Sequence, residues 1–202
     1  MTRKLFRQIV NGLIIVLFIF AGFYFIAQPY AFQGSLIEPP LPTADFSLAQ
    51  ADGTIFRLSE QQGNIVLIYF GYTYCPDVCP TTLYDLAKVK DRLGEENSPK
   101  VQVVMVTVDP ERDEPDHLEK YVTTFDPTFI GLTGEIKELE SIWNDFGVYR
   151  KKNKNPGATG YLVDHASRVY VIVRGGNLRL TFPFGMGFEA MGDDLAHLLQ
   201  SE

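Results

Sequence analysis

The only two cysteines of this chain, Cys75 and Cys79, lie close together in the stretch YFGYTYCPDVCPTTLYDL. A thiol pair at this spacing could form a disulfide, bind a soft metal ion, or supply a nucleophile together with the thiol that resolves its mixed disulfide. Each possibility predicts a different kind of protein. The elements around the pair narrow the choice.

A strand and a helix are predicted on the two sides of the cysteines. Residues Ile65 to Phe70 form a short, fully apolar run of the kind buried in the middle of a sheet. Cys79 then begins a series of apolar residues at helical spacing, which continues with Leu83, Leu86, Val89 and Leu93. A helix N-terminus stabilises negative charge, so this position favours thiolate, which is both the redox nucleophile and the metal ligand.

A metal site would need a further ligand, because two thiolates rarely complete one. Thiolates select soft ions, Cu(I) foremost, with Zn(II) as another possibility. His165 is the candidate, since it follows Asp164 in a predicted bend at an end of the sheet that could face the cysteine loop. An ordinary histidine in a polar turn is the alternative. His117 and His197 lie in predicted helices among charged neighbours, where we expect them to be solvated.

The remaining patterns predict an α/β domain with a thioredoxin-like fold and an N-terminal β-hairpin extension. Strands and helices alternate after the hairpin, and one strand and one helix are inserted before a closing hairpin and helix. The predicted elements are a hairpin of 46–49 with 54–57, strands at 101–108 and 129–132, helices at 115–125, 135–146 and 188–199, and antiparallel strands at 161–163 and 169–173.

The N-terminus predicts a membrane anchor. Ile9 to Ala27 is apolar except for Asn11, carries no charge, and is long enough as a helix to cross a bilayer. Arg3, Lys4 and Arg7 precede it, so the positive-inside rule keeps residues 1–8 in the cytoplasm. A cleaved signal peptide is the competing interpretation, although a clear cleavage site is lacking.

Residues 28–45 are rich in proline and lack periodicity, which indicates a tether between this transmembrane helix and a domain over residues 46–202. Residues 28–202 hold 15 basic and 25 acidic side chains, a net charge of −10, which excludes nucleic acid as a partner. Disulfides persist outside the cytoplasm. A thiol pair kept reduced there needs a reductant or a metal.

Four segments resemble one family. GYTYCPDVCPTTL, VTVDPERDEPDHLEKYV, FDPTFIGLTG and YLVDHASRVYVI are similar to the Sco (SenC) family, membrane-anchored copper proteins that assist assembly of cytochrome c oxidase. The resemblance extends from about Ala44 to Leu199. It implies that Cys75, Cys79 and His165 bind copper, both Cu(I) and, with an added donor, Cu(II).

The resemblance also implies a role. We expect a monomeric, non-enzymatic copper metallochaperone that serves the binuclear copper site of cytochrome c oxidase subunit II and exchanges copper with other carriers. Its domain would lie on the periplasmic side of a bacterial inner membrane, with the intermembrane-space side of the mitochondrial inner membrane as the alternative. Asp164 and Asp77 are expected to support the ligands, although Asp77 also fits an ordinary turn.

Two other functions stay open at this point. A thiol-disulfide oxidoreductase could reduce the cysteines of the same oxidase site with Cys75 and Cys79 as its exchanging pair. The usual redox motif has two residues between its cysteines, and thioredoxins carry a proline where this chain has Thr159 and Gly160. A copper or redox sensor would use the same ligands as a carrier.

Overall fold

The computed structural model of the chain describes residues 3–26, 29–153 and 160–201 and divides into two compact units, Met1–Ala31 and Phe32–Glu202. The first unit contains helix α1 (Arg3–Ile26). None of the helices within the described residues combines the length and apolarity that crossing a bilayer requires. The anchor expected over residues 9–27 therefore stays a prediction.

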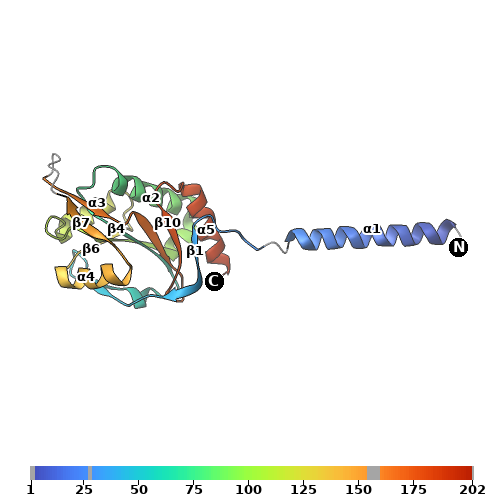
Figure 1. The fold of residues 1–202 in the computed structure, drawn as a ribbon, viewed down its shortest axis with the longest axis horizontal. Coiled ribbons are helices and arrows are strands. Elements are labelled where there is room, and N and C mark those ends of the chain that lie inside the picture. Colours follow the sequence, from blue (N-terminus) through green and yellow to red (C-terminus); the bar gives the residue numbers. More distant parts are fainter. Residues whose placement is uncertain (1–2, 27–28, 154–159, 202) are drawn as a thin grey trace. The chain divides into compact units, whose positions relative to one another are not determined.

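The second unit is built on a six-stranded mixed sheet in the order β1-β10-β9-β4-β5-β6 (Figure 1). β4, β5 and β6 run parallel, whereas β9, β10 and β1 each pair antiparallel with their neighbours. This arrangement confirms the predicted thioredoxin-like α/β class. The strands are β1 (Ser35–Pro42), β4 (Ile65–Gly71), β5 (Val101–Thr107), β6 (Ile130–Leu132), β9 (Arg168–Ile172) and β10 (Asn177–Pro183).

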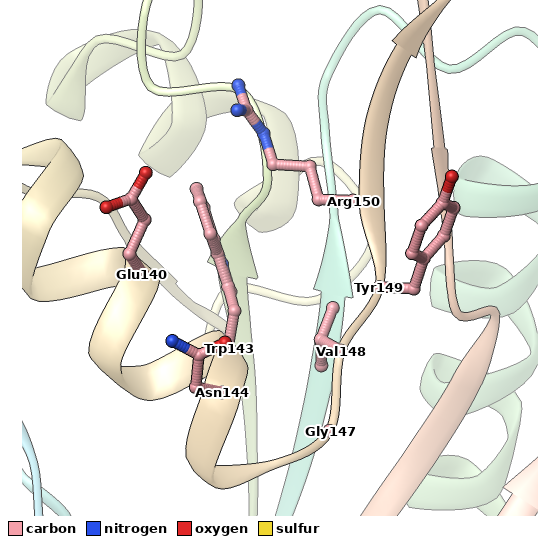
Figure 2. Close-up of a pocket in the computed structure, with 7 residues that line it drawn as sticks. All are labelled: Glu140, Trp143, Asn144, Gly147, Val148, Tyr149 and Arg150. Atoms are coloured by element: carbon pink, nitrogen blue, oxygen red, sulfur yellow. The ribbon is translucent and has the colours of Figure 1, made fainter.

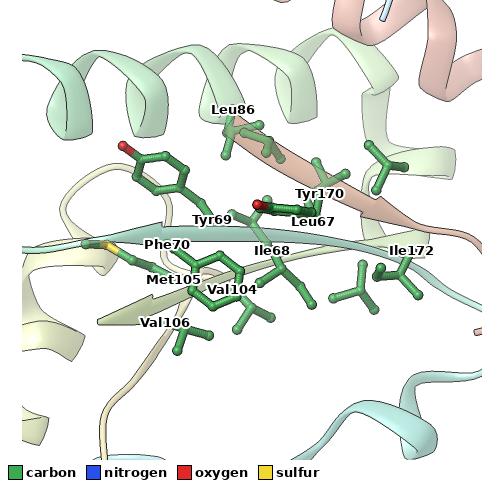
Figure 3. Close-up of a cluster of buried hydrophobic side chains, with 14 of the residues drawn as sticks. Leu67, Ile68, Tyr69, Phe70, Leu86, Val104, Met105, Val106, Tyr170 and Ile172 are labelled. Atoms are coloured by element: carbon green, nitrogen blue, oxygen red, sulfur yellow. The ribbon is translucent and has the colours of Figure 1, made fainter. Parts of the chain in front are cut away.

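The central strand β4 explains how the core forms, because every one of its residues is buried. Neighbouring residues of a strand point to opposite faces. Tyr69 accordingly points to one side of β4, where Leu86 of the covering helix also lies, and Phe70 points to the other (Figure 3). Phe70 packs on Phe146, with 5.4 Å between the ring centroids. Helices therefore cover both faces of the sheet.

The helices match the predicted ones closely. On the Tyr69 face, α2 (Val78–Asn97) packs against α5 (Phe188–Ser201), and α4 (Ile136–Asp145) leads to Phe146 on the other face. The remaining helix, α3 (Pro115–Thr123), packs against β6. A short helical turn, η1 (Leu58–Gln61), follows β3 (Ile55–Arg57), and another, η2 (Ser98–Lys100), joins α2 to β5.

Two small antiparallel sheets complete the described part of the domain. The predicted N-terminal hairpin is confirmed as β2 (Ser47–Ala49) paired with β3 (Ile55–Arg57). The predicted pairing of 161–163 with 169–173 is wrong. β8 (Leu162–His165) pairs instead with β7 (Arg150–Asn153), which lies where a loop was expected, and β9 pairs with β10 and β4. Four of the five residues of β9 are buried, as an interior strand of the main sheet requires.

The predicted tether over residues 28–45 is also corrected. Its residues Ser35–Pro42 form β1, an edge strand paired with β10, and the compact domain begins at Phe32. An edge strand needs backbone partners on one side only, so it tolerates prolines that would break an interior strand. The strand was not predicted because its sequence is rich in proline and its side chains are mostly exposed.

Candidate metal centre

Cys75 and Cys79 lie where β4 gives way to α2, as the sequence predicted. Cys75 is partly buried in the connecting loop, and Cys79, the second residue of α2, has no exposed surface. Gly71 allows the close approach of the sulfur, because a Cβ at this position would lie 3.2 Å from Cys79 Sγ and 2.7 Å from the Tyr69 ring. The strand end and the helix start thus bring both thiols to one edge of the sheet.

His165 reaches the same edge from β8. Its Nε2 lies 3.8 Å from Cys79 Sγ, and its Nδ1 lies 3.0 Å from the carbonyl oxygen of Ala166. Nε2 is thus the ring nitrogen that faces the cysteine sulfur and could bind a metal. The imidazole also makes edge-on contacts with the rings of Tyr69 and Tyr72, at centroid distances of 6.3 and 5.8 Å.

The two thiols differ in their acidity. A hydrogen bond from the Cys79 thiol, with others from His165 and the backbone N–H groups of Cys79 and Asp77, lowers the pKa of Cys75 to about 4. The Cys79 N–H donates to Cys75 Sγ at 3.3 Å, the expected effect of a helix N-terminus. Burial raises the pKa of Cys79, and the neighbouring Cys75 adds to that rise. Cys75 is thus the thiolate and Cys79 the buried thiol.

Tyr69 is a site residue that sequence reasoning missed. Its hydroxyl donates to Cys79 Sγ at 3.3 Å. Burial raises the pKa of Tyr69, so the hydroxyl keeps its proton. The available signal was a single tyrosine in a strand that is otherwise aliphatic up to Phe70. A buried tyrosine hydroxyl normally needs a partner, and the nearest polar side chains across a strand-helix junction belong to the cysteine loop.

Asp77 and Asp164 line the same cavity of about 280 Å³ as Cys75 and His165. Asp77 contributes its backbone N–H to Cys75, while its side chain is exposed. The Asp164 carboxylate accepts a hydrogen bond from Asn153 at 3.3 Å, and the His165 ring is held by the Ala166 carbonyl. Among the described residues, no three or more Cys, His, Asp and Glu side chains already converge as a metal-binding group.

Other candidates lie elsewhere. His117 is exposed and contacts Thr73, whereas His197 is partly buried on α5 with its ring 5.5 Å from that of Phe32. Met191 is buried in the core, as a gap-filling methionine would be. A second cavity, of about 460 Å³, is lined by Trp143, Arg150 and five other residues (Figure 2). The described residues that line it include neither cysteine nor histidine.

The donor set is therefore one thiolate, one buried thiol and one imidazole nitrogen at a partly open cavity. Sulfur and imidazole donors of this kind suit a soft or borderline ion. The model of the SCO1/SenC family matches residues 36–200. The chain belongs to the SCO1/SenC family.

Individual relatives agree with this result. The SCO2-like protein of Rickettsia felis is 38% identical over 149 residues, which cover 72% of this chain and 71% of that protein. The apo Sco1 protein of Thermus thermophilus is 37% identical with a TM-score of 0.76, covering 84% of this chain and 98% of that one. ScoI of Arabidopsis thaliana, solved with copper bound, is 31% identical with a TM-score of 0.74, covering 79% and 99%.

Proposed function

We propose that this chain is a copper carrier that binds the metal through Cys75, Cys79 and His165 and assists assembly of the binuclear copper site of cytochrome c oxidase subunit II. The observation that carries the proposal is the 3.8 Å approach of His165 Nε2 to Cys79 Sγ beside a Cys75 that is already a thiolate. The copper bound to the Arabidopsis relative supports the choice of metal.

The ligand chemistry suits both oxidation states of copper. Two thiolates and one imidazole hold Cu(I) in a three-coordinate site, and an added oxygen or nitrogen donor admits Cu(II). Cys79 releases its proton when the metal binds, because only thiolate is a good ligand. Tyr69 then donates its hydrogen bond to a coordinated sulfur, while Asp77 and Asp164 place negative charge around the cavity.

The same site is open enough to exchange its cargo. Cys75 is only partly buried and lies in a cavity at the surface, so a partner's thiolate can reach the metal while Cys79 still holds it. Besides subunit II, we infer that other copper carriers are partners, and that the domain works as a monomer.

We also propose that residues 9–27 anchor the chain, with the domain on the periplasmic side of a bacterial inner membrane. The support is the uncharged apolar run behind Arg3, Lys4 and Arg7. A mitochondrial inner membrane, with the domain in the intermembrane space, is the alternative location.

The experiment that tests the carrier is His165→Ala, with His197→Ala as the matched control. Loss of the imidazole should remove the charge-transfer absorption of thiolate-bound Cu(II) and prevent oxidase assembly in cells, because Cu(II) favours nitrogen donors more than Cu(I) does. The His197 variant should retain both. Normal oxidase assembly with His165→Ala would refute the carrier.

A thiol-disulfide reductase is the second candidate, favoured by the unequal acidity of the two thiols. Cys75 thiolate would attack one sulfur of a partner disulfide, forming a mixed disulfide and releasing the other sulfur as a thiolate. Cys79, after losing its proton, would attack Cys75 Sγ, which forms the Cys75–Cys79 disulfide and releases the partner reduced by two electrons. This chemistry needs no imidazole ligand, so His165→Ala with undiminished oxidase assembly would favour the reductase.

A further inference from the structure

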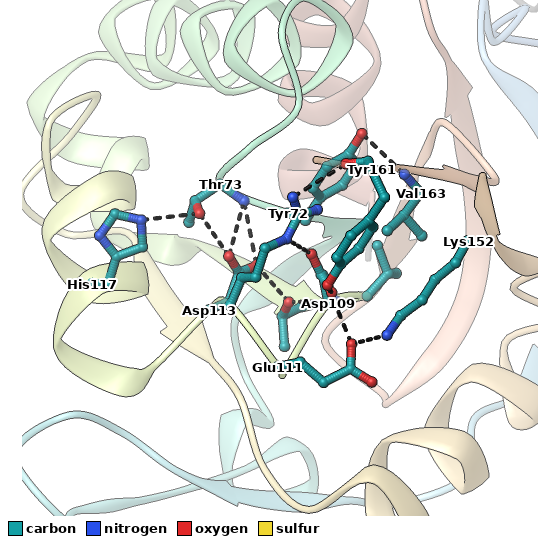
Figure 4. Close-up of polar contacts among 12 residues, drawn as sticks. Tyr72, Thr73, Asp109, Glu111, Asp113, His117, Lys152, Tyr161 and Val163 are labelled. Atoms are coloured by element: carbon teal, nitrogen blue, oxygen red, sulfur yellow. Dashed lines mark hydrogen bonds and ion pairs between the residues drawn. The ribbon is translucent and has the colours of Figure 1, made fainter. Parts of the chain in front are cut away.

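The proposed metal ligands lie on two segments that belong to different sheets. Cys75 and Cys79 follow β4 of the six-stranded sheet, whereas His165 ends β8, which pairs with β7 in a separate two-stranded sheet. A third segment contacts both of them. It is the 109–113 loop, Asp109 to Asp113, which connects β5 to α3 (Figure 4).

On the β8 side, the loop holds Tyr161, the residue that precedes this strand. The Arg112 guanidinium carbon lies 3.6 Å from the centroid of the Tyr161 ring, and Arg112 Nη1 donates to the Tyr161 carbonyl oxygen at 3.1 Å. The Tyr161 hydroxyl donates to Asp109 Oδ1 at 2.7 Å, and Arg112 Nε donates to Asp109 Oδ2 at 2.5 Å. The ring, hydroxyl and carbonyl of Tyr161 are thus all engaged by one ion pair.

That ion pair is itself shielded from solvent. The Asp109 side chain has no exposed surface and the Arg112 side chain is 15% exposed. A charged hydrogen bond is stronger and more directional in such surroundings than at a wet surface. Arg112 is therefore a rigid contact for Tyr161.

On the cysteine side, the same loop holds the residues between β4 and Cys75. Asp113 is fully buried and accepts a 2.6 Å hydrogen bond from the Thr73 hydroxyl and 3.3 Å bonds from its N–H. Arg112 lies 4.6 Å from the ring centroid of Tyr74 and 5.8 Å from that of Tyr72. The guanidinium therefore packs among aromatic rings from both ligand-bearing segments.

Tyr72 joins those segments directly, in addition to the approach of His165 to Cys79. The Val163 N–H donates to the Tyr72 hydroxyl at 3.3 Å, and the Tyr72 ring makes the edge-on contact with His165 described above. Movement of Tyr72 relative to β8 would therefore change the place of the imidazole. Arg112 touches Tyr72 on one side of this contact and Tyr161 on the other.

We propose that Arg112 is a positioning residue of the metal centre, which keeps His165 within reach of Cys79 by clamping Tyr161 against the cysteine loop. This inference rests on the proposed copper function for its metal, but the clamp itself is a property of the metal-free chain. Loss of this residue should affect the two oxidation states of copper unequally. Loss of Arg112 weakens the imidazole ligand and leaves the two sulfurs in place, so Cu(II) binding suffers more than Cu(I) binding.

The competing role for the loop is local, as the turn that starts α3. That role predicts that changes in the loop lower stability without altering the metal site selectively. Replacing one partner of a buried ion pair is strongly destabilising in any case. The test therefore needs variants that keep a cation at position 112 or leave the ion pair untouched.

Two variants meet this need. Arg112→Lys keeps the positive charge beside Asp109 but loses the planar group that stacks on Tyr161. Tyr161→Leu removes the stacked ring and leaves Arg112 and Asp109 in place. Tyr161→Phe keeps the stacked ring and loses only the hydroxyl that donates to Asp109, so it is the conservative variant and should retain most of the Cu(II) affinity. Lys88→Gln, which removes an exposed lysine 5.6 Å from the Tyr84 ring on α2, is the control for loss of a cation near an aromatic ring.

The first readout is copper binding. In Arg112→Lys and Tyr161→Leu, Cu(II) affinity should fall 10- to 100-fold with a changed thiolate-to-Cu(II) absorption band, while Cu(I) affinity changes less than about threefold. The rate of Cys75–Cys79 disulfide formation should stay the same. Lys88→Gln should match the unchanged protein, and Tyr161→Phe should lose much less Cu(II) affinity than Tyr161→Leu. Equal loss of Cu(I) and Cu(II) affinity, or an unaltered absorption band in both variants, would overturn the clamp.

The second readout needs no metal. In the copper-free protein, hydrogen exchange of the Val163 amide should become at least about tenfold faster in both variants, because its acceptor Tyr72 is no longer held against β8. Unchanged protection in a folded variant would refute the inference. If the unchanged protein failed to bind copper, the proposed function would fall, and the exchange measurement would still decide on the clamp.

Discussion

Cys79 Sγ lies 3.8 Å from His165 Nε2, although 86 positions separate the two residues in the sequence. One residue is carried by the first turn of α2 and the other by the last position of β8. The distance therefore depends on how a small surface sheet docks on the main one.

Cys75 should react as a thiolate at mildly acidic pH. Its pKa is lowered to about 4, so the thiolate fraction is complete at pH 6 and the rate of alkylation by iodoacetamide should be flat from pH 6 to 8. An ordinary cysteine, with a pKa of about 8.5, would react roughly tenfold faster for each pH unit over most of this range. Mass spectrometry of the copper-free, reduced protein locates the label, and Cys79 should stay unmodified. A steep rise of the Cys75 rate with pH would contradict the prediction.

The same alkylation measurement tests the direction in which His165 shifts the pKa of Cys75. The imidazole helps to lower the pKa of Cys75, so His165→Ala should raise that pKa and slow alkylation at pH 5 to 6. In this variant the pH below which the alkylation rate begins to fall should therefore be higher than in the unchanged protein. His197→Ala, on α5, serves as the control and should leave the profile unchanged.

Tyr69→Phe should weaken Cu(I) binding without loss of the fold. The substitution keeps the ring in the core and removes only the hydroxyl that donates to Cys79 Sγ. A hydrogen bond contributes about 0.5–1.5 kcal/mol, so Cu(I) affinity should fall about threefold to tenfold in competition with a chromophoric chelator. Tyr170→Phe, at another buried tyrosine of the main sheet, is the control. Equal affinities for both variants would show that the hydroxyl is unimportant to the metal.

Asp194→Ala should destabilise the domain by about 3 kcal/mol, because the buried carboxylate accepts hydrogen bonds from the backbone N–H groups of Gln33 and Gly34. Its neighbour Asp193 provides the matched control. Asp193 forms an ion pair with Arg92 in which both side chains are nearly half exposed, so Asp193→Ala should cost less than about 1 kcal/mol. Urea denaturation of residues 29–202 measures both. Similar losses of unfolding free energy in the two variants would mean that the hydrogen bonds of Asp194 to the chain before β1 do not stabilise the domain.

The membrane topology can be tested with a reporter enzyme that is active only outside the cytoplasm. Fused after Glu202, it should be active, because Arg3, Lys4 and Arg7 precede the apolar run and hold the N-terminus inside. Moving the three basic residues to the far side of the run is the control and should reduce export. An unaltered chain that is produced in full but leaves the reporter inactive would contradict the proposed orientation.

Much of the fold was readable from the sequence because local patterns report local structure. The apolar run at β4, the helical spacing after Cys79 and the turn between β2 and β3 each depend on residues close in the chain. The thiol pair at a strand-helix junction was predictable for the same reason. The choice of His165 followed from the small number of histidines and from family resemblance.

Pairing between distant segments was decided only by the tertiary structure. β8 and β9 look like a hairpin because they are adjacent, yet β9 is buried in the main sheet and β8 joins β7. β1 has no apolar alternation, since an edge strand is held by backbone hydrogen bonds to one neighbour. The unequal pKa values of Cys75 and Cys79 depend on the burial of Cys79 and on its hydrogen bond to Cys75, and the contacts proposed to act as a clamp join Arg112 to Tyr161 across 49 positions; no local pattern encodes such burial or such contacts.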